Sequence, residues 1–212
     1  MAKLTATKAD QKYAIVEINQ MASRTTGAMI ADAPLAKDFK TVGKESDTQE
    51  FAENGMILYF DPTAERTDTD RNGKGAFVGT AKAGLSYGLL FSTEHLYDNF
   101  SKDLASFKMN KPTKALLGGT HFEDYPRVYT LAMNDKFTTD AIIDGDGTES
   151  SPKLIDKIGS ETIYGQANGG YITLTKTAPT IGPVLQAIEK TTTPASYGGI
   201  VEPAVKFMVV KA

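Results

Sequence analysis

The sequence LSYGLLF at residues 85–91 decides the fold together with VYTLAMNDKFTTDAII at residues 128–143. The first is a short apolar run in which Gly84 and Gly88 mark bends or close backbone approach, and it predicts a buried strand. In the second, apolar and polar residues alternate on both sides of Asn134-Asp135, a pair that tolerates a positive φ. It predicts two strands, 128–133 and 137–143, joined as a hairpin.

Between these two segments, residues 94–107 carry an apolar stripe. This stripe consists of four apolar residues spaced by four, four and three positions, so they would lie on one face of a helix: Leu96, Phe100, Leu104 and Phe107. Ser92 or Thr93 can cap its first turn. The pattern predicts one short amphipathic helix lying on the sheet.

Further strands are predicted on either side of this stretch, at residues 13–18, 56–60, 171–175, 184–190 and 204–210. The strand at 56–60 is expected to end at Asp61-Pro62, with an exposed loop from 63 to 75 and a new strand starting at Phe77-Val78. Residues 27–31 could form a strand, while 150–166 are weakly patterned and predict a short helix and a linker. The last two strands predict a C-terminal β-hairpin lobe.

The predicted fold class is therefore mainly β, α+β at most. We expect an antiparallel β-sandwich or barrel-like core with one short amphipathic helix and that C-terminal hairpin lobe. The expected division is a β-rich core domain with an N-terminal arm at residues 1–165, and a small β lobe at residues 166–212.

The bulk composition restricts the function classes. The 212 residues have a net charge of −3 with both signs interspersed, so no basic stripe suggests a nucleic-acid partner. Cysteine is absent, which excludes disulfides and thiolate chemistry. No segment approaches the ~18 apolar residues of a membrane span, and the first residues lack the apolar core of a signal peptide. We expect a protein that is neither exported nor membrane-bound.

Two acidic stretches are candidate metal sites. Asp68, Asp70 and Asn72, followed by Gly73, match the opening of a calcium loop, but Gly79 stands where that loop needs a bidentate glutamate. A polar turn is the favoured interpretation, and the three residues remain weak metal candidates.

The second stretch holds Asp144, Asp146 and Glu149 within six residues. Asp-Gly pairs are also common in tight turns, so a turn is again favoured. We predict no bound cofactor.

No catalytic constellation is visible. The two histidines, His95 and His121, have no nucleophile elbow and no metal-ligand spacing around them. We therefore predict a protein that is not an enzyme.

A binding patch is a better supported hypothesis. Tyr125, Tyr129 and Phe137, with Arg127, are residue types favoured at interface hot spots. Sheet residues filling a core are an equally good interpretation of Tyr129 and Phe137.

Several segments occur in an order that resembles the auxiliary head proteins of tailed bacteriophages, the decoration or cement proteins. They are Glu53-Asn54-Gly55-Met56, the run from Leu89 to Asp98, Tyr125-Pro126-Arg127-Val128 and Asn134-Asp135-Lys136-Phe137-Thr138-Thr139. In addition, Thr192-Thr193-Pro194 followed by Pro203-Ala204-Val205-Lys206-Phe207 is similar to the capsid-attaching end segment of some phage head-fibre proteins. The loop from Pro194 to Pro203 is longer than in that segment.

The resemblance implies a structural virion protein that binds the outer surface of the capsid in many copies and stabilises it. Its partners would be the major capsid protein and either itself, as a homo-oligomer, or other virion proteins. It would be assembled in the cytoplasm of the host bacterium. The residues expected to contact the partner are Tyr125, Pro126, Arg127, Lys206 and Phe207.

Two alternatives stay open. One keeps the virion and makes the chain a neck, tail or head-fibre base component anchored by the C-terminal hairpin. The other is a calcium-dependent carbohydrate-binding module or small hydrolase that uses the loops at Asp68 or Asp144.

Overall fold

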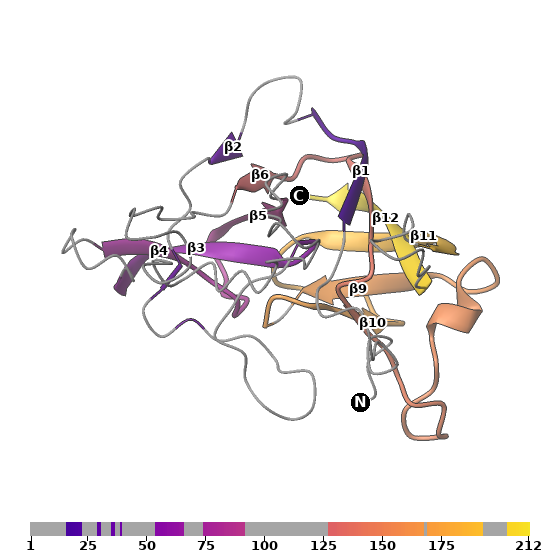
Figure 1. The fold of residues 1–212 in the computed structure, drawn as a ribbon. Helices are drawn as coiled ribbons and strands as arrows, with labels where there is room; N and C mark the ends of the chain where they lie inside the picture. The colour runs from indigo at the N-terminus through magenta and orange to yellow at the C-terminus, as the bar shows by residue number, and fades with distance from the viewer. Residues whose placement is uncertain are drawn as a thin grey trace, which may run out of the picture.

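The computed structural model describes residues 16–22, 29–30, 35–36, 39, 54–65, 74–91, 127–167, 169–192 and 203–212. Over these residues the chain is mainly β, as the sequence predicts. Two open sheets, one of seven strands and one of five, share a hydrophobic cluster (Figure 1).

The seven-stranded sheet has the order β1-β7-β12-β11-β9-β10-β8. Its pairs are antiparallel except β10 with β8. The predicted C-terminal hairpin is confirmed, since β11 pairs with β12 over nearly its whole length. In sheet order the strands are β1 (Val16–Gln20), β7 (Lys136–Thr139), β12 (Pro203–Lys211), β11 (Val184–Thr192), β9 (Ile163–Ala167), β10 (Ile172–Thr175) and β8 (Ile142–Ile143).

The five-stranded sheet is antiparallel throughout, with the order β2-β6-β5-β3-β4. These strands are β2 (Met29–Ile30), β6 (Val128–Thr130), β5 (Ser86–Leu90), β3 (Ile57–Glu65) and β4 (Lys74–Val78). The predicted end of β3 at Pro62 is wrong, because a register shift between Asp61 and Glu65 accommodates the proline within the strand. Phe77 and Val78 end β4 and do not begin it.

Both faces are buried at the centre of the five-stranded sheet. Successive residues of β3 point to opposite faces: Ile57 and Tyr59 join the cluster shared with the seven-stranded sheet, whereas Leu58 joins a second cluster with Phe77 and Leu90. This explains why the sequence of β3 opens with a continuous apolar run and not with alternation. The seven-stranded sheet supplies Phe137 and Phe207 to the shared cluster, and their ring centroids are 5.8 Å apart.

The turn at Asn134-Asp135 exists, but the hairpin predicted there is wrong. Asn134 has a φ of 71°, and the Asp135 N–H donates to the Ala132 carbonyl at 3.1 Å. However, β6 pairs with β5 and β2, whereas β7 pairs with β1 and β12 in the other sheet. Within the turn, the Asn134 N–H donates to the Val209 carbonyl at 2.8 Å, so the chain leaves β6 and pairs with β12.

The strand predicted at 137–143 is split in two. The Ile142 N–H donates to the Asp140 carbonyl at 2.8 Å, and the Ala141 N–H donates to Thr139 Oγ1 at 3.0 Å. This bend ends β7 at Thr139 and sends Ile142 and Ile143 to the far edge of the same sheet as β8.

The domain boundary expected between residues 165 and 166 falls inside strand β9 (Ile163–Ala167). Strands from both sides of it pair in the seven-stranded sheet, since β12 lies between β7 and β11. Residues 150–166 hold the short 3-10 helix η2 (Ile155–Lys157), in a region where a short helix was predicted. Strand β9 follows it, in place of the predicted linker. The helix predicted at 94–107 lies outside the described residues. Within the part of the chain that is described, no helix has the length and apolarity to cross a membrane.

The side chain of Asp144 holds the start of η2 in place through hydrogen bonds. Its side chain is buried, and Oδ1 accepts the N–H groups of Gly145 and Leu154 at 2.8 Å each, while Oδ2 accepts that of Ile155 at 3.0 Å. A carboxylate that accepts several backbone N–H groups satisfies donors that would otherwise be buried without a partner.

We expect Asp144→Ala to lower the free energy of unfolding by about 2–4 kcal/mol, because buried N–H groups left unsatisfied cost about 1–3 kcal/mol each. Asp146 is exposed and accepts hydrogen bonds from Thr148, so Asp146→Ala is the matched control and should cost much less than Asp144→Ala. Urea unfolding followed by circular dichroism measures both. Equal losses would show that Asp144 does not anchor this segment.

Two glycines in the left-handed region give a second test. A Cβ on Gly55 (φ 84°) would overlap the Thr139 side chain, whereas a Cβ on Gly84 (φ 79°) would meet no atom within 4 Å. Both alanine variants carry the left-handed strain of about 1–2 kcal/mol. Only Gly55→Ala adds an overlap in the core, which typically costs a further ~1–3 kcal/mol. Urea midpoints that shift equally would contradict the packing at Gly55.

Candidate functional site

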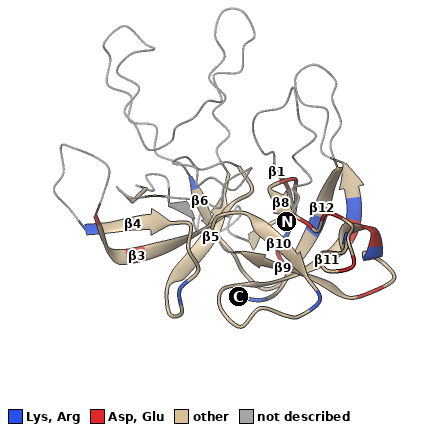
Figure 2. Cartoon of the chain, turned by 90° about the horizontal axis from the view of Figure 1, so that it is seen from below, with Lys and Arg blue, Asp and Glu red and all other residues tan. Residues whose placement is uncertain are grey.

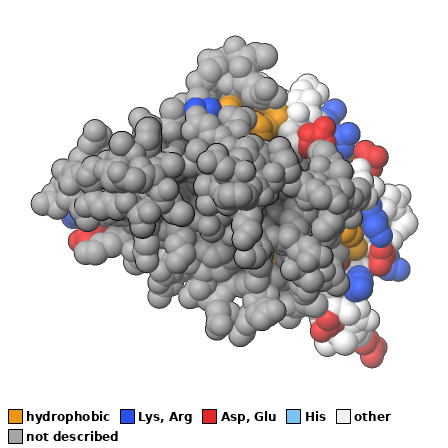
Figure 3. Space-filling model, in the orientation of Figure 1, with side chains coloured by type: hydrophobic (Ala, Val, Ile, Leu, Met, Phe, Trp, Pro, Cys, Tyr) orange, Lys and Arg blue, Asp and Glu red, His pale blue; other side chains and the backbone are white. Residues whose placement is uncertain are grey.

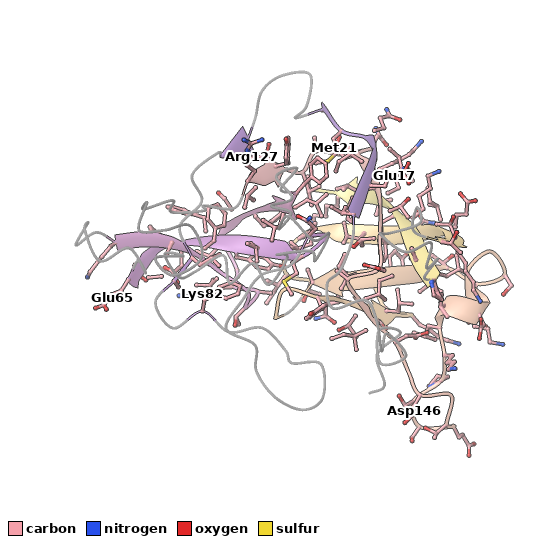
Figure 4. All side chains as sticks on the ribbon, viewed as in Figure 1. Glu17, Met21, Glu65, Lys82, Arg127 and Asp146 are labelled. Atoms are coloured by element: carbon pink, nitrogen blue, oxygen red, sulfur yellow. The ribbon has the colours of Figure 1, made fainter. Side chains whose placement is uncertain are left out.

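The structure separates the residues predicted to bind a partner. Arg127 directly precedes β6 in the five-stranded sheet, where its carbonyl accepts the Phe91 N–H at 3.0 Å (Figure 4). Lys206 lies in β12 of the other sheet, half-exposed, with Nζ 3.5 Å from the Glu189 carboxylate on β11. Tyr125 and Pro126 lie outside the described residues, as do Asp68, Asp70, Asn72 and both histidines.

Phe207 requires a correction. It follows Lys206 on β12, so its side chain points to the opposite face, where it is fully buried against Phe137. Its aromatic ring belongs to the shared core and not to a surface that a partner could contact.

Tyr129 and Phe137 pack in the core of the protein, which is the second of the two interpretations given for them above. Phe137 is fully buried, and the half-buried Tyr129 packs its ring 5.7 Å from that of Phe91. Neither is the centre of an exposed aromatic patch.

The acidic loop at residues 144–149 is built as a set of turns. Asp144 faces inward to η2, as described above. Asp146 lies on a loop that extends away from both sheets (Figure 4), where it accepts the Thr148 N–H at 3.0 Å and the Thr148 hydroxyl at 2.7 Å. These bonds hold the pKa of Asp146 below its usual range. Among the described residues, no three His, Cys, Asp or Glu side chains are grouped to hold a metal ion.

Charged residues gather at the end of the seven-stranded sheet where β11 leads into β12 (Figure 2), and their side chains lie on the surface there (Figure 3). Lys190 donates to Asp156 at 2.6 Å, Lys176 lies 2.7 Å from Glu161, and Lys206 pairs with Glu189. Exposed pairs of this kind contribute little to the free energy of unfolding. We call this the charged end.

A corner at the opposite end of the same sheet has a different character. It consists of the exposed residues Asn19, Gln20 and Ala22, which follow β1 to its end, and Met133 and Asn134 in the turn before β7. Asp135 joins the two segments, because its buried carboxylate accepts the N–H groups of Ala22 and Ala132 at 2.8 Å each. Figure 4 shows Glu17 on β1 and Met21 at the end of that strand. We call this surface the exposed corner.

The sequence did not reveal this corner. The alternation of residues 128–133 placed Met133 inside a strand, whereas β6 ends at Thr130 and the Met133 side chain is 61% exposed. The only available signal was the turn pair Asn134-Asp135 directly after it.

The ion pair between Lys190 and Asp156 allows a titration test at the charged end. The hydrogen bond from Lys190 holds the pKa of Asp156 below its usual range. We expect Lys190→Met to raise that pKa, whereas the control Lys176→Met should raise the pKa of Glu161 and leave Asp156 unchanged. Carboxyl carbon NMR titration measures both groups.

The sign for stability follows from the lowered pKa. The stabilisation from Asp156 is present at neutral pH and is lost as the pH falls through its folded-state pKa, below the usual aspartate range. Because the pair is exposed, added salt should weaken it. A titration of Asp156 that is identical in Lys190→Met would contradict this pairing.

Comparisons of the chain with protein-family models, with curated proteins and with solved structures found no match.

Proposed function

We propose that this chain is a non-enzymatic structural protein of a tailed-bacteriophage virion. In this proposal it binds the outer surface of the capsid in many copies and stabilises the shell through contacts with the major capsid protein. The resemblance of its segments to decoration proteins supports the proposal, and so does the mainly β architecture.

One observation carries the proposal from the structural side, namely the free edge at β1. This strand is the edge of the seven-stranded sheet, and none of the described strands pairs with its outer side. The side chains of Glu17, Asn19 and Gln20 are exposed along it. An edge of this kind offers backbone groups and side chains to a partner chain.

The β1–β7 pairing has a register shift at Asn19. We infer that this shift favours pairing with one specific partner and disfavours the repeated addition of strands from further copies. The pairing of β1 with β7 skips Asn19, whose side-chain oxygen instead accepts the Thr138 hydroxyl at 2.8 Å. Bulges of this type interrupt an edge and suppress unlimited pairing between copies. A protein displayed in many copies on one shell needs this restraint.

The buried polar groups also support a structural role. Both oxygens of Asp135 and both of Asp144 accept backbone N–H groups. Thr139 Oγ1 likewise accepts the N–H of Ala141. These side chains are occupied in holding the chain together.

The test uses expanded shells assembled from the major capsid protein, mixed with the purified chain. We expect saturable co-sedimentation at many copies per shell, and a higher temperature of shell disruption in differential scanning calorimetry. The chain unfolded in urea and added under the same conditions controls for nonspecific adsorption. Failure to bind the shells, with no gain in their heat resistance, would overturn the proposal, and binding at only a few copies would favour the neck or tail alternative.

A further inference from the structure

Three buried residues lie against strand β4, the last strand of the five-stranded sheet (Figure 1). They are Leu35, Ala36 and Phe39, which precede β3 in the sequence and are 1%, 0% and 3% exposed. Leu35 forms a parallel bridge with Phe77 of β4, and the Ala36 N–H donates to the Phe77 carbonyl at 3.0 Å. We call Leu35, Ala36 and Phe39 the clip.

The clip occupies the side of β4 that faces away from β3. Phe77 pairs with Phe60 of β3 on one side, so its bridge to Leu35 lies on the other, because a strand has only two hydrogen-bonding sides. The Phe60 and Phe77 rings are 5.4 Å apart, and Leu35 and Phe39 belong to the same buried cluster as Phe77. The Phe39 N–H donates to the Ala36 carbonyl at 2.9 Å. The clip is therefore anchored in the core and closes the outer edge of β4.

The edge that the clip covers lacks the other protections of an edge strand. Proteins guard sheet edges against unwanted pairing with charged side chains, proline or bulges, or they cover the edge with another segment. From Ala76 to Val78, β4 has no charged residue, no proline and no register shift. Strand β1, by contrast, carries Glu17 and the register shift at Asn19. Among the described residues, the clip is what protects β4.

We propose that the clip is an autoinhibitory contact that prevents a second copy of this chain from pairing with β4. A second copy fits the uncovered edge, because antiparallel pairing of the two β4 strands brings no like charges together between Ala76 and Val78. With the clip in place, the Phe77 carbonyl has a donor and Leu35 fills the position of the next strand. This inference does not depend on the proposed function.

The test measures self-association of clip variants, each checked for folding by circular dichroism. Ala36→Pro removes the N–H that binds the Phe77 carbonyl, and Phe39→Ser removes the ring that anchors the clip in its cluster. We expect each to raise the weight-average mass in sedimentation equilibrium about twofold or more, since pairing at one β4 edge joins two copies. Leu154→Ser is the matched control, because it removes a buried apolar side chain from the other cluster and leaves the clip intact.

A second-site variant locates the contact between copies. Val78 is half-buried at the end of β4, and Val78→Lys places on this edge a charge that opposes pairing. Added to Phe39→Ser, it should restore the mass of the unchanged chain, and alone it should leave that mass unaltered.

The two clip variants remove different contacts, so a folding defect in one leaves the other to decide. If the folded clip variants sediment as the unchanged chain does, the inference is overturned. It is also overturned if Leu154→Ser associates to the same extent, because general destabilisation would then be the cause. Association that persists after Val78→Lys is added would place the contact on another surface and likewise overturn it.

Discussion

The buried carboxylate of Asp135 holds the place where the chain crosses from one sheet to the other. Three segments meet there: the end of β1, the residues that follow β6, and the start of β7. In the low dielectric of a buried site, a charged acceptor with two N–H donors is strong, and its loss would leave both donors unsatisfied. A second link lies where the Tyr59 hydroxyl donates to the Ala167 carbonyl at 3.1 Å. Burial raises the pKa of Tyr59 well above its ordinary value, which favours the protonated hydroxyl that donates this bond.

These links explain where the surface features lie. The centre of the five-stranded sheet is covered on both faces, so the side chains there contribute mainly to packing. The seven-stranded sheet buries Phe137 and Phe207 on its inner face and leaves the β1 edge, the charged end and the exposed corner at the surface. The segment that crosses between the sheets at Asp135 also builds the corner. The same bonds that join the sheets therefore give the corner its rigidity.

Sequence patterns predicted the strands whose periodicity is strong and local. The apolar run before Asp61, the alternation at residues 171–175 and the C-terminal pair predicted at 184–190 and 204–210 all became strands. The Asn134-Asp135 turn was also predicted, but local turn chemistry does not determine which strand the chain pairs with afterwards. Strand β9 was missed because Gly165 breaks its apolar pattern. The structure requires that glycine, since a Cβ there would press on Phe207 and Ile172. Phe207 was assigned to a surface from a resemblance, although its alternation with Val205 and Val209 predicts a buried face.

The position of β12 has a consequence for how the chain is made. This strand comprises residues 203–211, yet it lies in the middle of its sheet, between β7 and β11. During synthesis β7 leaves the ribosome long before its neighbour exists, and it has only the edge strand β1 to pair with. The seven-stranded sheet therefore closes late and through contacts distant in sequence, which slows folding. Until then β7 and β11 are unpaired edges that other nascent chains could join, so high expression should place this protein at risk of aggregation before completion.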